Sequence, residues 1–320
     1  MQKILVIQTA FIGDAILATS VLEKIHAHFP SVQLDILVRK GNETLFAGHP
    51  YIHECIVWNK LEGKYKSLFR LLKQVRKEDY DKVVNLHRYS SSGFLTGFSK
   101  AKEKIGFDKN PLSFLFTRKI KHEIGNGKHE VERNQQLIES FTDKNFAKPR
   151  LYPTIQNSEK VATYKTGNYV CMAPSSVWFT KQLPKHKWVE LCDKLPGSTT
   201  VYLLGAGSDS TLCEEIMAKS THTKIINLCG KLNLLDSCAL MRDAEMNYVN
   251  DSGPLHLASA MNAPTTAFFC STVPAFGFTP LSDKSQVIET KKYLDCKPCG
   301  LHGYKQCPRG HFDCGNTIEV

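Results

Sequence analysis

Residues 246–260, MNYVNDSGPLHLASA, contain the clearest strand-to-helix transition in the chain. The apolar run Met246–Val249 predicts a buried strand, and Ser252 stands where a side chain caps a helix that begins at Pro254. Gly253 lets backbone amides come close to a ligand, and unpaired amides at a helix start attract anions. The stretch therefore predicts a phosphate-binding loop, with an ordinary capped helix as the alternative.

Two ionisable side chains flank this transition. His256 falls in the first helical turn, where its imidazole can donate to a phosphate oxygen or a ribose hydroxyl. Asp251 would repel a phosphate, so we expect it to orient the loop instead. The other reading of His256 is a half-buried histidine with ordinary hydrogen-bond partners.

The strand-to-helix pattern recurs along the whole chain. In the first half, apolar runs predict strands over 3–8, 34–38, 52–57 and 82–85, with a helix over 15–28 after the first. In the second half they predict strands over 169–172, 200–204, 225–228, 246–249 and 264–270, with helices over 185–195, 211–220 and 234–243 and from 254. Alternating strands and helices form parallel sheets.

This pattern predicts an α/β protein with two doubly wound, Rossmann-like domains facing a central cleft. We expect a first domain over 1–150, a linker over 151–166 and a second domain over 167–320 that ends in a Cys-rich tail. Ligands of such sheets bind beyond the carboxyl ends of the strands.

The chain has 320 residues, and its 41 Lys and Arg against 31 Asp and Glu give a formal net charge of +10. Such a charge predicts an anionic partner. No run reaches the roughly 18 apolar residues of a membrane span, and we expect no cleaved leader. These features predict a cytoplasmic protein without a transmembrane segment.

Basic residues concentrate in two segments of the first half, 60–82 and 100–133. Within the first, Tyr65, Leu68, Leu72 and Val75 follow helical spacing, so the lysines should occupy the outer face of an amphipathic helix. That face is either solvated or a docking surface. The neighbouring aromatic residues fit helix packing better than stacking on bases, which argues against a nucleic-acid partner.

The loop TAFIGD, 9–14, follows the first predicted strand. Gly13 permits close approach of the backbone, and Asp14 stands at a helix start. There it is either a charge favoured by the helix dipole or a general base that takes a proton from an attacking hydroxyl.

The loop APSSVWFTKQLP, 173–184, follows the first strand of the second half. Ser175 and Ser176 can hydrogen-bond phosphates, and Lys181 can neutralise charge that builds on a diphosphate leaving group. The alternative for Lys181 is a solvated loop lysine.

The loop GAGSDS, 205–210, is similar to the start of a dinucleotide-binding fingerprint, but Ser210 occupies the third glycine position. The strand that follows does not end in an acidic residue, which would bind a ribose. An NAD-dependent oxidoreductase is therefore the weaker alternative among enzymes.

Four motifs in this order resemble a known family: QTAFIGDAILAT (8–19), APSSVWFTKQLP (173–184), the stretch from Leu228 to Pro274, and CKPC (296–299). They resemble glycosyltransferase family nine, the ADP-heptose:lipopolysaccharide heptosyltransferases, over almost the whole chain. The resemblance implies a GT-B fold, with the acceptor bound by the first half and ADP-heptose by the second.

The resemblance also implies roles for individual residues. Asp14 matches the catalytic base of an inverting, single-displacement transfer. The donor-binding positions match Ser175, Ser176, Lys181, Asp251, Ser252, Gly253 and His256. The family needs no metal or other cofactor for this chemistry, and another nucleotide sugar or acceptor is the alternative within it.

The acceptor implied by the resemblance is the inner core of lipopolysaccharide, an anionic lipid that carries Kdo and heptose. The acceptor contacts we expect in the first half are Gly13, Arg88, Lys128, His129 and Arg133, although each charged residue among them could equally be a surface charge. A peripheral position at the cytoplasmic face of the inner membrane is an open alternative to free solution. Family members usually continue into a further helix after the cysteine segment, whereas this sequence ends at Val320.

The tail contains Cys296, Cys299, Cys307 and Cys314, which are enough soft ligands for a tetrahedral zinc ion. Reduced thiols in a Gly- and Pro-rich loop are the alternative, and a disulfide framework is not expected in the cytoplasm. A zinc ion held by four cysteines would have a structural role.

Overall fold

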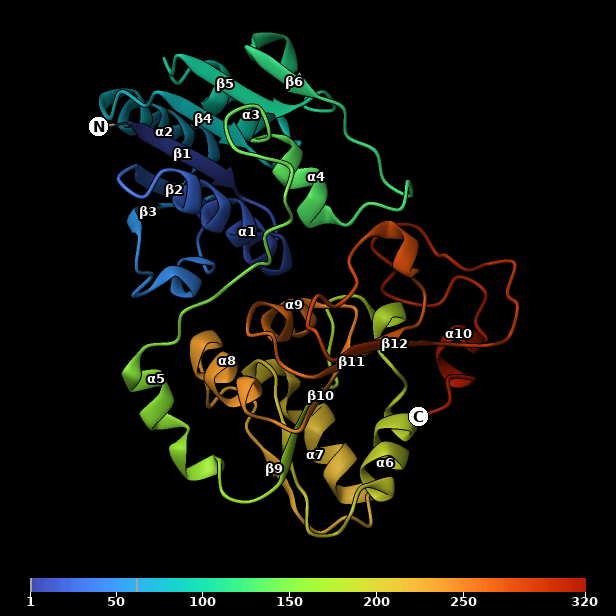
Figure 1. The fold of residues 1–320 in the computed structure, drawn as a ribbon. Coiled ribbons are helices and arrows are strands. Elements are labelled where there is room, and N and C mark those ends of the chain that lie inside the picture. Colours follow the sequence, from blue (N-terminus) through green and yellow to red (C-terminus); the bar gives the residue numbers. More distant parts are fainter. Residues whose placement is uncertain (1, 62) are drawn as a thin grey trace. The chain divides into compact units, whose positions relative to one another are not determined.

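The chain divides into two compact units, one ending at Tyr152 and the other beginning at Pro153 (Figure 1). The computed structural model describes residues 2–61 and 63–320. In that part of the chain each unit contains a six-stranded sheet whose neighbouring strands are all parallel. The break lies within the segment 151–166, for which a linker was expected.

The first unit has the strand order β3-β2-β1-β4-β5-β6. Its strands are β1 (Lys3–Gln8), β2 (Gln33–Arg39), β3 (Ile52–Trp58), β4 (Lys82–Asn85), β5 (Glu103–Phe107) and β6 (Arg118–Ile120). Its helices are α1 (Ile12–His28), α2 (Lys64–Lys77), α3 (Ser90–Gly97) and α4 (Glu130–Gln136). Helix α1 packs against α4, and α2 packs against α3.

The second unit repeats this plan with the order β12-β11-β10-β7-β8-β9. Its strands are β7 (Tyr169–Ala173), β8 (Thr200–Leu203), β9 (Ile225–Asn227), β10 (Met246–Asn250), β11 (Thr265–Phe269) and β12 (Ser285–Glu289). Its helices are α5 (Ile155–Lys160), α6 (Lys185–Lys194), α7 (Ser210–Lys219), α8 (Leu234–Arg242), α9 (Gly253–Ala260) and α10 (Asp313–Asn316). Helix α6 lies beside α7, and α8 packs against both α5 and α9 (Figure 1).

The central strands form because they are nearly continuous apolar runs, as strands covered by helices on both faces require. Residues 4–7 of β1 are fully buried, and so is most of β11. In each sheet the strand order reverses between two central strands. These are β1 and β4 in the first sheet and β7 and β10 in the second. Crevices beyond the carboxyl ends of such strands are where ligands bind in this kind of sheet.

Several predicted element bounds differ from the structure. The predicted helix over 15–28 begins earlier, at Ile12, so Asp14 lies inside the first turn. Strands β5, β6 and β12 were not predicted, because they are short or carry exposed polar residues and lie at or near a sheet edge. Inside the expected linker, α5 forms with Thr154 capping its first turn.

Helix α2 buries Leu68, Leu72 and Val75, which confirms the predicted apolar stripe. Of the neighbouring aromatic residues, Tyr80 is buried, as packing predicts, whereas Tyr65 and Phe69 are 71% and 60% exposed. Phe69 contacts Phe94 of α3 edge-on, at 5.5 Å between ring centroids. The outer face of α2 is thus both basic and aromatic.

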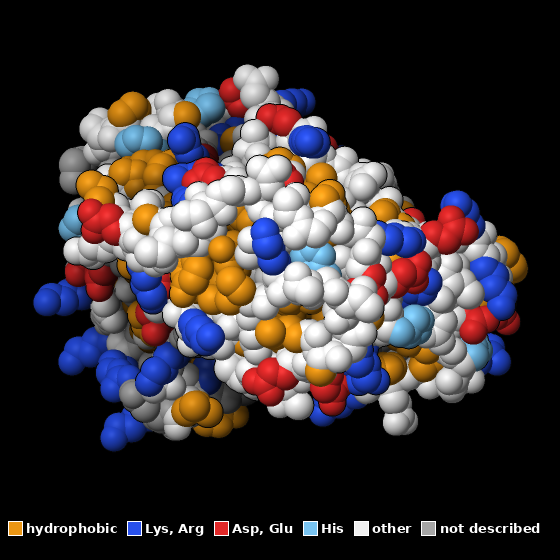
Figure 2. Space-filling view, turned by 90° about the horizontal axis from the view of Figure 1, so that it is seen from below, with side chains coloured by type: hydrophobic (Ala, Val, Ile, Leu, Met, Phe, Trp, Pro, Cys, Tyr) orange, Lys and Arg blue, Asp and Glu red, His pale blue; other side chains and the backbone are white. Residues whose placement is uncertain are grey.

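Figure 2 shows several Lys and Arg side chains close together at the lower left of the view. Within residues 2–61 and 63–320, no helix is both long enough and apolar enough to cross a membrane.

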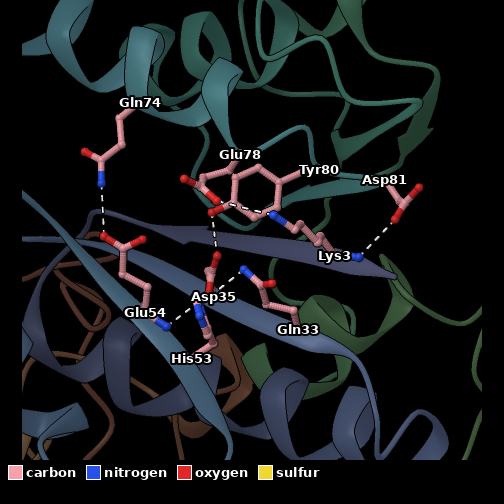
Figure 3. A network of polar contacts seen from close by, with 9 residues as sticks. All are labelled: Lys3, Gln33, Asp35, His53, Glu54, Gln74, Glu78, Tyr80 and Asp81. Carbon is pink, nitrogen blue, oxygen red and sulfur yellow. Dashed lines mark hydrogen bonds and ion pairs between the residues drawn. The ribbon is translucent and has the colours of Figure 1, made fainter. Parts of the chain in front are cut away.

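A buried carboxylate, Asp35 of β2, organises one end of the first sheet (Figure 3). The Tyr80 hydroxyl donates to Asp35 Oδ2 at 2.6 Å, and the Glu54 amide donates to Oδ1 at 2.9 Å. His53 Nδ1 lies 3.0 Å from the same Oδ1. The pairing of β2 with β3 shifts register between Leu34 and Asp35, so these contacts hold the strands where the ladder is irregular.

We expect Tyr80→Phe to lower the free energy of unfolding of the first unit by about 1.5–3 kcal/mol, because it leaves a buried carboxylate with one donor fewer. Tyr169→Phe is the matched control, since its hydroxyl donates to the neutral carbonyl of Leu240 at 2.9 Å. That variant should lose only about 1 kcal/mol. Denaturant unfolding measures both, and equal losses would contradict a special role for the Asp35 charge.

Candidate functional site

Asp14 stands in the first turn of α1, directly beyond the carboxyl end of β1. The helix begins without a side-chain cap at Phe11, and the nearby backbone amides of Phe11 and Asp14 act to lower the pKa of the Asp14 carboxyl. The carboxylate lies at the helix start, at the ligand-binding edge of the sheet.

The surroundings of Asp14 raise its pKa to about 6. Burial is the largest cause, and the negative charge of Glu130 adds to it, whereas Arg88 and the backbone amides act in the opposite direction. A carboxylate with such a pKa is ionised at neutral pH and is a stronger base than an ordinary aspartate. It therefore has the acid–base property that a general base needs.

A chain of polar contacts lies beside Asp14. Arg88, which follows β4, places Nη1 3.3 Å from His122 Nδ1, and His122 Nε2 is 3.9 Å from Glu130 Oε2. Arg133 donates from Nε to the same Glu130 oxygen at 2.7 Å. Burial tends to raise the pKa of Glu130, but His122 and Arg133 outweigh it and leave the pKa lowered. Glu130 is therefore a buried anion that acts on Asp14.

The sequence pattern missed Glu130 and His122. Both lie in the second basic segment, where the excess of lysine and arginine concealed a buried acidic residue. The sequence signal was the run HEVER at 129–133, in which acidic and basic residues alternate just before a helix.

Three of the expected acceptor contacts lie at the start of α4. His129 is its N-cap and accepts from the Val131 amide at 3.1 Å, in a capping box with Glu132. The buried Arg133 guanidinium also donates to the backbone carbonyl of Lys128. These contacts of His129 and Arg133 hold the start of α4. Gly13 lies in the first turn of α1, which follows β1, and Arg88 follows β4.

In the second unit, Lys181 and Asp251 form an ion pair, with 2.7 Å between Nζ and Oδ2. Asp251 is buried, and Thr272 donates its hydroxyl to the same carboxylate oxygen at 2.6 Å. These residues follow β7, β10 and β11, which are adjacent in the sheet. An ammonium group has three donors, so Lys181 can hold Asp251 and still meet a phosphate.

Asn250, the last residue of β10, links the end of this strand to the loop 173–184. It was not identified as a site residue from the sequence. Its buried side chain accepts from the Leu183 amide at 2.8 Å and donates to the Pro174 carbonyl at 2.8 Å. Both partners belong to the loop that carries Lys181. A polar residue at the end of a buried strand was the signal that could have identified it.

The two serines of this loop have different surroundings. Ser175 donates to Asp209 Oδ1 at 2.8 Å, and the Ser176 carbonyl accepts from the Gln182 side chain at 2.6 Å. The predicted ligand serines thus lie beyond β7, as expected, with Ser175 linked to the loop after β8.

Helix α9 begins where the sequence predicted, within one residue, at Gly253. Ser252 is its N-cap by position, but the expected capping hydrogen bond from its side chain is not made; its hydroxyl instead points to the Asn250 carbonyl at 3.5 Å. His256 is buried in the first turn of α9, with its ring 6.4 Å from Phe278.

The glycines of the 205–210 loop serve close packing. A Cβ on Gly205 would lie 2.9 Å from Asp209, and a Cβ on Gly230 would lie 2.9 Å from the Gly207 Cα. The Asp209 side chain also accepts from the Ala206 amide at 2.8 Å. Contacts within the unit thus account for these glycines.

The structure does not support the zinc site that the four tail cysteines offered as one of two possibilities. Among the residues described, no three His, Cys, Asp or Glu side chains are grouped as metal ligands. Cys314 is buried against the core of the second unit, whereas Cys296 is partly exposed, with Sγ 3.8 Å from His311 Nε2. Burial raises the pKa of Cys314 to about 12, so this thiol behaves as a small apolar group.

The two parallel sheets, with a charged site beyond the strand ends of each, define the class of protein. The fold is that of the GT-B glycosyltransferases. It matches an Escherichia coli ADP-heptose lipopolysaccharide heptosyltransferase II with a TM-score of 0.79, at 21% identity over 93% of this chain and 96% of that one. An E. coli heptosyltransferase solved with ADP matches with a TM-score of 0.72, at 17% identity over 89% of this chain and 92% of that one.

The family model of glycosyltransferase family 9 (heptosyltransferase) matches residues 68–304. The chain belongs to this family and is a glycosyltransferase. Among curated relatives, lipopolysaccharide heptosyltransferase 1 of Pseudomonas aeruginosa is 26% identical over 93% of this chain and 86% of its own length. Membership of this family confirms the resemblance and the enzyme class, and it displaces the NAD-dependent oxidoreductase as an explanation.

Proposed function

We propose that this enzyme transfers heptose from ADP-heptose to the inner core of lipopolysaccharide, with inversion at the anomeric carbon. The observation that carries the proposal is Asp14. In a member of this family, a carboxylate whose pKa is raised to about 6 lies in the first turn of α1, beyond β1. These are the place and the acidity that a general base requires.

In the proposed step, Asp14 accepts the proton of an acceptor sugar hydroxyl while the hydroxyl oxygen attacks the anomeric carbon. The bond from that carbon to the diphosphate oxygen breaks, and its electron pair leaves with ADP. Because bond formation and bond breaking occur on opposite faces of the carbon, a single displacement inverts the configuration. The second unit has to stabilise the negative charge that develops on the diphosphate.

Lys181 and the amides at the start of α9 are the groups we assign to that task. A cation and helix amides placed at a developing anion perform the electrostatic work for which other enzymes use a divalent metal ion. Asp251 holds Lys181 in place, and Ser175, Ser176, Ser252, Gly253 and His256 complete the proposed donor site around the ends of β7 and β10. No cofactor is part of this proposal.

The test is release of ADP by the purified enzyme from ADP-heptose, with a deacylated Kdo-containing core as acceptor. Acceptor-dependent release supports the proposal. Binding of ADP-heptose without release would direct the search to other acceptors, including cores that already carry heptose, and no binding would overturn the donor. A panel of ADP-, UDP- and GDP-sugars then tests the alternative of another nucleotide sugar.

We further propose that the acceptor is drawn from the membrane surface by the outer face of α2. This face exposes Lys66, Lys73 and Lys77 beside Tyr65 and Phe69. Basic residues attract the anionic headgroups of lipids, and aromatic rings suit the interface between lipid and water. The enzyme would then work at the cytoplasmic face of the inner membrane as a peripheral protein.

Replacement of these three lysines by Gln should raise the KM for a lipid-embedded acceptor by up to about 100-fold at low salt, since each cation near an anionic surface contributes up to about 1 kcal/mol before screening. The KM for ADP-heptose should not change. The matched control replaces the exposed Lys219, Lys284 and Lys305 of the second unit by Gln. Equal effects in both triple variants would show that net charge alone matters.

A further inference from the structure

Thr180, the neighbour of Lys181, forms hydrogen bonds to the C-terminal segment through both its backbone and its side chain. Its amide donates to the Tyr304 carbonyl at 3.1 Å, and the Tyr304 amide donates to the Thr180 hydroxyl oxygen at 2.8 Å. Thr180 is buried, whereas its partner Tyr304 is 47% exposed. Two reciprocal bonds fix the position of Thr180 relative to the tail.

Ser271, which follows β11, completes the contact. Its hydroxyl donates to Thr180 Oγ1 at 3.0 Å, and its amide donates to the Thr180 carbonyl at 3.2 Å. The Ser271 carbonyl in turn accepts from the amide of Cys299 at 2.8 Å. The loop after β7, the loop after β11 and the tail therefore meet at a single threonine.

Gly303 places the tail close to the lysine itself. A Cβ on this residue would lie 2.8 Å from Thr180 Oγ1, 3.1 Å from Ser271 Oγ and 3.3 Å from Lys181 Cγ. The φ angle of Gly303 is +74°, a region that favours glycine. Any other residue would disturb both the backbone of the tail and the Thr180 contact.

We propose that Thr180 and Gly303 are positioning residues for Lys181, so that the tail segment 299–304 is a working part of the donor site. The inference rests on the proposed role of Lys181 toward the donor diphosphate. The Lys181 side chain is long and flexible, and its ion pair with Asp251 constrains only its charged end. The Thr180 contacts constrain the backbone next to Lys181. Together with the Asp251 ion pair, they fix the position of the Lys181 ammonium group.

The test uses Thr180→Val, which keeps the shape of the side chain but removes the acceptor of two hydrogen bonds. We expect kcat/KM for ADP-heptose to fall about 10-fold or more, because small displacements of a catalytic cation are costly. The KM for the acceptor should stay within about twofold, since the affected loops belong to the donor side. Gly303→Ala should act in the same direction, and it carries the test if Thr180→Val does not fold.

Two comparisons separate positioning from a general loss of structure. Thr180→Ser keeps the hydroxyl and should recover most of the loss. Thr290→Val removes a hydroxyl that pairs with Thr317 in an exposed part of the tail, and it should leave donor use unaffected. Equal losses in Thr180→Val and Thr290→Val, or no recovery in Thr180→Ser, would overturn the inference.

A double-mutant cycle with Lys181→Ala completes the design. If Thr180 acts through Lys181, adding Thr180→Val to Lys181→Ala should cause little further loss, whereas independent effects would add. An impaired Lys181→Ala with an unimpaired Thr180→Val would overturn the positioning inference alone. Wild-type donor use in Lys181→Ala would overturn the proposed function of the lysine itself.

Discussion

Asp14→Asn should reduce kcat of heptose transfer by about 10²–10⁴-fold, the range that a positioned general base contributes. The amide has nearly the same shape but cannot accept the proton of the attacking hydroxyl. Binding of ADP-heptose should persist, since the proposed donor groups all lie in the second unit. Acceptor-dependent ADP release and calorimetric binding of ADP measure the two effects.

The Asp14→Asn protein should also be at least as stable as the wild type at pH 8. The folded-state pKa of about 6 lies above the ordinary value of 3.8, so ionisation of Asp14 disfavours the folded state as pH rises through that range. The variant avoids this cost, which separates loss of catalysis from unfolding. Asp79→Asn makes the same charge change at an exposed residue and serves as the control. Substantial turnover in Asp14→Asn would refute its role as base.

The same pKa sets the pH dependence of the wild-type enzyme. Below pH 6 Asp14 becomes protonated, so kcat/KM should fall by about tenfold per pH unit in acid and level off above pH 7. The residual activity of Asp14→Asn should lack this acidic limb. An identical limb in the variant would assign the titration to another group.

Lys181→Ala should lower kcat/KM for ADP-heptose by about 10²–10³-fold, the loss typical when one group that stabilises a developing anion is removed. The change removes the cation proposed for the diphosphate and leaves the buried Asp251 without its ion pair. Asp251 would then add repulsion to the lost attraction. Lys181→Arg keeps the charge and should recover part of the rate.

Lys185→Ala is the matched control, because Lys185 belongs to the same stretch of chain but pairs with the exposed Glu215. Exposed pairs contribute little, so donor kinetics should hardly change. Steady-state kinetics with the donor varied at saturating acceptor measure both variants. If Lys181→Ala and Lys185→Ala behave alike, Lys181 is a surface lysine and the donor site is misplaced.

The sequence by itself determined the fold class and the central strands. Apolar runs such as KILVIQ at β1 and YVCMA at β7 are buried almost throughout, so hydrophobic pattern alone identifies them. The hydrophobic pattern did not predict β6, because its residues Arg118 and Lys119 are exposed at a sheet edge. Such strands form because a neighbouring strand offers hydrogen bonds, which no local pattern records.

The sequence also determined which loops follow strands, and hence the candidates Asp14, Lys181 and Asp251. Only the tertiary structure decided what surrounds them. Parallel strands bring their carboxyl ends to one edge of a sheet, so Lys181 and Asp251 meet although 70 positions separate them. The raised pKa of Asp14 likewise depends on burial and on the distant Glu130. Charge and burial act through space, whereas sequence patterns describe neighbours along the chain.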